Sequence, residues 1–187
     1  RVLHLSIRRQ RQMCIRDRIL KALSRLQLNQ GACEKAYELI QLLYEANPFE
    51  DEHVLLKLQA SHCMNVKDQV KLILDSSEQR RSEVKIHFDL MRAQVLLDDG
   101  KLVAAETLLE KIQNADKKFP ETYYWHSQAK RLQKKDFQDL ARGYLALCKN
   151  ISVETKNKYR FEPKICLEER HIEAELEELK NKSVAGD

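Results

Sequence analysis

Residues 19–48 read ILKALSRLQLNQGACEKAYELIQLLYEANP and contain two apolar stripes separated by a polar turn. In both halves the apolar residues recur at steps of three and four, which is the spacing of one face of an α-helix. Gly31 follows the first stripe, where a helix commonly ends in a left-handed residue, and Pro48 ends the second stripe. The pattern predicts two antiparallel helices joined by a tight turn, a helical hairpin.

The hairpin pattern recurs along the chain. Small residues near the start of each second helix mark its period, because Ala36, Ala105 and Ala141 are separated by 69 and 36 residues. The first interval has room for two units of about 34–35 residues, so we expect a degenerate hairpin between the first and the third. The predicted hairpins cover residues 19–50, 51–82, 86–120 and 121–150.

Several positions agree between the hairpins. A large residue and a small one lie in the first helix, a turn with glycine follows, the second helix carries a small and then a bulky residue, and proline closes the unit. The matching residues are Leu23, Ser24, Gly31, Ala36, Ile40 and Pro48, then Ala93, Gly100, Ala105 and Leu109, then Trp125, Ala129, Ala141 and Leu145. In period and positions, residues 19–150 resemble the tetratricopeptide repeat (TPR) family. The resemblance implies an all-α fold, a right-handed α-solenoid of antiparallel helix pairs.

The last part of the chain departs from the repeat pattern. Residues 151–165 are polar and contain Pro163, so we predict a connector. Residues 166–182 return to a helical pattern with a single apolar stripe, which suits a C-terminal capping helix that covers the last repeat. A short coiled-coil seam is the alternative for this helix. Residues 183–187 form a tail.

Residues 1–18 carry six arginines and one acidic residue, Asp17, and without them the formal net charge of +4 becomes −1. The segment RRQRQMCIRDR, residues 8–18, resembles one reading frame of an adapter used to prepare sequencing libraries. We therefore interpret residues 1–18 as an artefact, disordered or spuriously helical, and the chain as a metagenomic fragment whose own N-terminus is truncated. A basic arm and a transit peptide are the alternatives.

Composition restricts the class of protein. Four glycines and three prolines in 187 residues suit helices better than sheets. No apolar run approaches the roughly 20 residues that cross a bilayer, and the first thirty residues do not resemble a secretory signal. The five cysteines are odd in number and form no C-x-x-C motif. They predict reduced thiols in a cytoplasmic protein.

Motifs for catalysis are absent from the sequence, so we predict that the chain is not an enzyme and needs no cofactor. Ser61, His62 and Cys63 are consecutive, and consecutive helical side chains point about 100° apart. Cys148, Cys166 and His171 leave zinc one ligand short. We therefore predict no metal site.

The TPR resemblance implies a groove lined by the first helix of each hairpin, which binds a peptide or a protein. Transferred one position at a time, the groove residues are Lys21, Arg25, Asn29, Lys57, Asn65, Gln94, His126, Lys130 and Lys134, with Ser61, Leu90 and Asp98 beside them. Their mildly basic character suits an acidic peptide or a C-terminal carboxylate.

The sequence thus favours a non-enzymatic scaffold or adaptor with a protein or peptide partner and with no nucleic-acid or membrane partner. The first alternative is that these repeats regulate a larger multidomain protein, such as a bacterial transcriptional regulator, a signalling protein or a transferase. The second alternative is self-association through the bare face of the first repeat.

Overall fold

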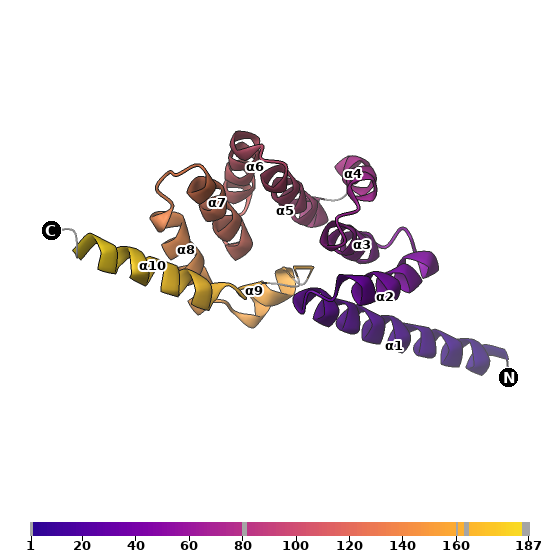
Figure 1. Cartoon of the computed structure of the whole chain (residues 1–187). Helices are drawn as coiled ribbons and strands as arrows, with labels where there is room; N and C mark the ends of the chain where they lie inside the picture. Colours follow the sequence, from indigo (N-terminus) through magenta and orange to yellow (C-terminus); the bar gives the residue numbers. More distant parts are fainter. Residues whose placement is uncertain (1, 80–81, 160, 163–164, 185–187) are drawn as a thin grey trace. The chain divides into compact units, whose positions relative to one another are not determined.

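The computed structural model describes residues 2–79, 82–159, 161–162 and 165–184 (Figure 1). These residues form helices, turns and irregular segments without a β-strand, which confirms the predicted all-α class. The chain divides into two compact units, an N-terminal unit up to residue 80 and a C-terminal unit from residue 81. We describe each unit by itself.

The N-terminal unit is built from helices that pack against their neighbours in the chain. Its elements are α1 (Val2–Asn29), α2 (Cys33–Ala46), α3 (Asp51–Cys63), α4 (Lys67–Ser76) and the 3-10 turn η1 (Ser77–Gln79). Ala36, Ile40 and Leu43 of α2 pack with Leu56 and Ala60 of α3 in its core. The α1 backbone runs without a break through residue 18, so no structural boundary marks the segment interpreted as an adapter.

The C-terminal unit has the same serial packing, and its last helix returns to α8. Its elements are α5 (Ser82–Asp98), α6 (Leu102–Ala115), α7 (Pro120–Leu132), α8 (Gln138–Lys149), α9 (Val153–Lys158) and α10 (Glu169–Val184). Ile172 of α10 is fully buried against Tyr144 and Cys148 of α8. Helix α9 lies in the segment that the sequence predicted as a connector.

Four helices, α1, α3, α5 and α7, end in the same hydrogen-bonded cap. The cap residue has a positive φ and is Gly31, Asn65, Gly100 or Lys134. Its N–H donates to the carbonyl three residues back, and the next N–H donates to the carbonyl five residues back. This is the Schellman motif. The caps recur at intervals of 34 (31 to 65), 35 (65 to 100) and 34 residues (100 to 134).

The caps also set a common register for the buried positions. The residue seven places before each cap is 0 % exposed in all four helices: Ser24, Leu58, Ala93 and Ser127. The second helix begins two residues after the first three caps, but Gln138 begins α8 four residues after Lys134. The fourth turn therefore contains two additional residues.

Substitutions at the caps should have opposite effects on stability. An added Cβ at Gly100 meets no atom within 4 Å. The cost of Gly100→Ala therefore comes from the backbone strain of a side chain at a φ of 73°. We expect a loss of about 1 kcal/mol. Lys134 has a φ of 57°. Lys134→Gly should raise the free energy of unfolding by about 0.5–1 kcal/mol, measured by urea unfolding and circular dichroism.

Lys111→Gly is the matched control, because Lys111 is exposed in the interior of α6. Glycine in a helix interior costs about 1 kcal/mol. If Lys134→Gly destabilised the protein as Lys111→Gly does, the left-handed cap would not limit stability at position 134.

Candidate functional site

Counting back from the caps separates the predicted groove residues into two registers. The first register lies ten, six or two residues before the cap and contains Lys21, Arg25, Asn29 and Gln94. The second register lies eight, four or zero residues before it and contains Lys57, Asn65, His126, Lys130 and Lys134. Two residues turn an α-helix by about 200°. The structure therefore places the two sets on opposite sides of their helices.

Lys21 and Arg25 of the first register meet at one carboxylate. Lys21 Nζ lies 2.8 Å from Glu52 Oε2, and Arg25 Nη2 lies 2.5 Å from Glu52 Oε1. Glu52 is in the first turn of α3, so these bonds tie α1 to α3. Asn29 is exposed at the end of α1. This end of the N-terminal unit therefore presents two partly exposed cations, and both are paired with the single carboxylate of Glu52.

Lys57 of the second register faces α2. It is 2 % exposed, its Nζ lies 3.6 Å from the centroid of the Tyr37 ring, and it donates a hydrogen bond to Gln41. The hydrogen bond from Lys57 is the largest influence on Tyr37 and lowers the pKa of its hydroxyl. Lys57 thus joins α3 to α2, while Asn65 serves as the cap residue of α3.

In the C-terminal unit, the chain after α8 packs onto the other helices. The Tyr159 ring stacks on Phe119, with centroids 4.5 Å apart, and shares a core with Leu90 of α5. Glu121 of α7 accepts the Cys166 N–H at 2.7 Å. Gln94, a first-register residue of α5, is buried. Tyr159 therefore packs in a core with α5, and Cys166 is hydrogen-bonded to α7.

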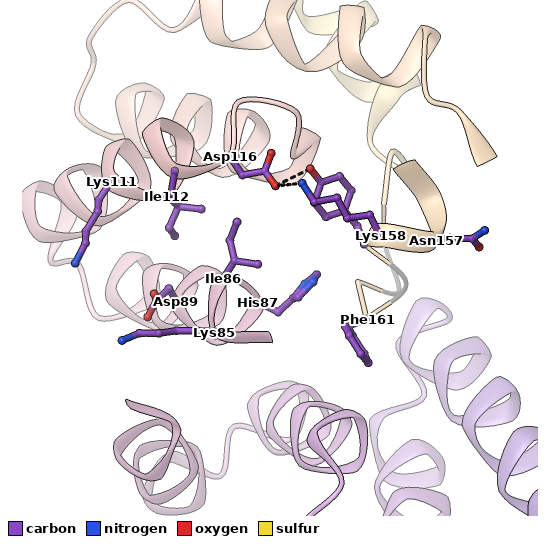
Figure 2. A pocket seen from close by; sticks show the side chains of 12 residues that line it. Lys85, Ile86, His87, Asp89, Lys111, Ile112, Asp116, Asn157, Lys158 and Phe161 are labelled. Atoms are coloured by element: carbon purple, nitrogen blue, oxygen red, sulfur yellow. Dashed lines mark hydrogen bonds and ion pairs between the residues drawn. The ribbon is translucent and has the colours of Figure 1, made fainter. Parts of the chain in front are cut away.

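A cavity of about 650 Å³ lies between α5, α6 and α9 (Figure 2). Figure 2 shows Lys85 and Lys111 at one end and His87 and Phe161 at the other. Its lining residues are Lys85, Ile86, His87, Asp89, Lys111, Ile112, Ala115, Asp116, Asn157, Lys158, Tyr159 and Phe161. The lining thus combines apolar side chains with three lysines and two aspartates, of which Lys158 and Asp116 are paired with each other.

Three groups at this cavity have shifted pKa values, and burial raises that of the Tyr159 hydroxyl. Burial lowers the pKa of the His87 imidazole to about 4, and the charge of Asp116 opposes this only in part. Burial acts to raise the pKa of Asp116, but hydrogen bonds from Lys158 and Tyr159, at 2.6 and 2.8 Å, lower it overall. At neutral pH His87 is therefore uncharged, and Asp116 is an anion with its charge already matched.

The second-register residues of α7 divide by environment. His126 is 4 % exposed and lies against α6, where its Nδ1 is 3.0 Å from Gln113 Oε1. Burial, followed by the charge of Lys130, lowers the pKa of His126. Lys130 is half-buried, and Lys134 is the exposed cap residue. A peptide on the surface would reach Lys134 and Lys130 but not the His126 ring.

Four of the cysteines form disulfides, so the prediction of reduced thiols is wrong for them. Cys33 pairs with Cys63, and Cys148 pairs with Cys166. Cys33 begins α2 and Cys63 ends α3. Antiparallel neighbours bring such ends together despite a sequence separation of 30. As members of disulfides, Cys63, Cys148 and Cys166 cannot act as the free thiols or metal ligands that the sequence analysis considered.

Comparisons with known proteins gave no match to a protein-family model, to a curated protein or to a solved structure.

Within the described ranges, every helix is too short or too polar to traverse a lipid bilayer.

Proposed function

We propose that the chain is a TPR-like interaction scaffold that binds a protein or peptide and performs no reaction of its own. The observation that carries the proposal is the recurrence of one helix cap at intervals of 34 or 35 residues, with a fully buried position seven residues before each cap. Stacked helix pairs of one length are a common way to present side chains in fixed register. A right-handed solenoid closed by α10 is part of this proposal.

The first register supplies the proposed binding face in the N-terminal unit. Lys21 and Arg25 bond to Glu52, and the exposed fractions of their side chains are 21 % and 28 %. Partly exposed ion pairs of this kind contribute only about 0–1 kcal/mol each, so an incoming carboxylate can compete with Glu52. Arginine also binds a carboxylate with two parallel hydrogen bonds. The favoured partner is an acidic peptide or a C-terminal carboxylate.

Charge reversal at this face should weaken peptide binding. In fluorescence anisotropy against a panel of acidic peptides, with amidated and free C-termini, we expect at least one peptide to bind the unaltered chain. Lys21→Glu/Arg25→Glu should then weaken binding by about tenfold or more, because a hydrogen bond to a charged group contributes roughly 1.5–3 kcal/mol.

Lys35→Glu/Lys71→Glu is the matched control, with the same charge change at exposed positions of α2 and α4. This control and Lys130→Glu should bind within about twofold of the unaltered chain. Equal weakening by all three variants would show that net charge, and not the proposed face, controls peptide binding. No binding by any acidic peptide would contradict the proposed partner class.

The compartment is a separate question from the binding face. A cytoplasmic location is the prediction of the sequence, whereas disulfides such as Cys33–Cys63 and Cys148–Cys166 persist mainly in oxidising compartments. The proposed binding face contains no cysteine and does not depend on the outcome.

A further inference from the structure

Two glutamates and a histidine converge between α6 and α7 of the C-terminal unit. Glu106 and Glu110 are four residues apart on α6, so their side chains lie on one face of that helix. His126 comes from α7, which packs against α6. One potential ligand atom from each of the three residues lies within 4.8 Å of the other two.

The hydrogen bond to Gln113 fixes the state of the His126 ring. Gln113 Oε1 can only accept, so the Nδ1 atom at 3.0 Å carries the proton. Nε2 of the neutral ring then has a free lone pair. This atom is buried and has no hydrogen-bond partner. A histidine that binds a metal characteristically donates its other N–H to an oxygen in the same manner.

A buried lone pair beside two carboxylates needs a positive charge or a proton donor to be stable. Both hydrogen bonds to Glu106, from Gln133 and Lys135, end on Oε2, and Oε1 is left for another ligand. Glu110 is exposed and can turn toward the ring. We propose that His126 Nε2, Glu106 and Glu110 bind a divalent transition-metal ion, of which Zn²⁺ is the first to test.

The donor set decides between classes of metal ion. Imidazole favours zinc and its neighbours in the transition series, whereas magnesium and calcium prefer sites made of oxygen alone. Zn²⁺ accepts one nitrogen and two carboxylate oxygens at about 2.0–2.2 Å. Two carboxylates also match the charge of a divalent ion. Lys135 would then keep its hydrogen bond to Glu106 Oε2 or move into solvent, since its side chain is half exposed.

Space for a further ligand lies next to the ring. A cavity of about 480 Å³ borders Glu110, Gln113 and His126. Three protein ligands with a water in the fourth position form the open type of zinc site. The cavity is large enough to hold that water.

The test uses the full, untagged chain after treatment with a chelator. Titration with ZnCl₂ in a calorimeter should show one tight site and a raised unfolding temperature. His126→Ala and Glu110→Gln should each weaken Zn²⁺ binding by at least about tenfold, and Gln113→Leu should weaken it by about tenfold through the orientation of the ring. Glu110→Gln changes an exposed side chain, so it tests the site even if His126→Ala does not fold.

His171→Ala is the control, because His171 is an exposed histidine of α10 outside this cluster. It should bind Zn²⁺ as the unaltered chain does. The proposal is overturned if the unaltered chain binds no Zn²⁺, or if Glu110→Gln binds it with unchanged affinity. Weakening by His171→Ala with no weakening by Glu110→Gln would likewise place the ion elsewhere and overturn the site.

Discussion

Acidification from pH 7 to pH 4 is expected to destabilise the C-terminal unit by about 3 kcal/mol through His87 alone. Burial lowers the pKa of this imidazole in the folded protein to about 4, against an ordinary value of 6.5. Between these pH values the unfolded chain binds a proton that the folded chain rejects, so stability falls as pH falls. Each pH unit in this window costs about 1.4 kcal/mol. Urea unfolding at intervals of pH, followed by the fluorescence of Trp125, measures the slope.

The packing around His87 explains the size of this effect. The ring is 2 % exposed and meets Phe119 and Phe161 edge to face, with centroids 5.3 and 5.5 Å away. Asp116 is the nearby anion that favours the charged form, but its carboxylate is already bonded to Lys158 and Tyr159. Protonation would therefore place a charge among aromatic rings without a free counterion.

His87→Phe keeps an aromatic ring at this position and removes the titrating group. The variant should lose most of the slope between pH 6.5 and 4. A smaller slope should remain, because burial also lowers the pKa of His126 in the same direction. His171→Phe, at an exposed position of α10, should keep the full slope. An unchanged slope in His87→Phe would show that other groups control acid unfolding.

The helical class of the fold could be predicted because hydrophobic periodicity is a local property of the sequence. Gly31 was also expected at a left-handed position and Gly100 at a turn, and both have a positive φ. Lys134 takes the same conformation without any signal in its residue type. Missing it shifts the inferred register of the fourth hairpin by two residues, and this is why His126 was placed on the groove face.

Contacts between distant segments could not be predicted in the same way. The pairing of Cys148 with Cys166 and the stacking of Tyr159 on Phe119 depend on the path of the chain after α8. That path follows from packing rather than from periodicity. Glu106 and Glu110 have helical spacing, but nothing in the sequence indicates that His126 turns toward them. Tertiary packing thus determines the candidate metal site, while the repeat period follows from local patterns.

Removal of the Cys148–Cys166 disulfide should destabilise the C-terminal unit by about 3 kcal/mol. The bond closes a loop with a sequence separation of 18, and the chain-entropy model assigns roughly this value to a loop of that size. It also fixes the segment before α10 next to α8, where Ile172 is buried. Cys148→Ala/Cys166→Ala should lower the free energy of unfolding measured through Trp125, and α10 should be cleaved faster by protease.

The unaltered chain in reductant is the control that keeps both sulfur atoms. With both proteins in reductant, which also opens Cys33–Cys63, the unaltered chain and the double variant should agree, since the covalent bond accounts for the effect. A lower stability of the variant under these conditions would come from the buried Cys148 side chain. Thiol titration of the denatured chain, purified without reductant, should find one thiol, because two disulfides leave Cys14 alone among the five cysteines. Five thiols would contradict both disulfides.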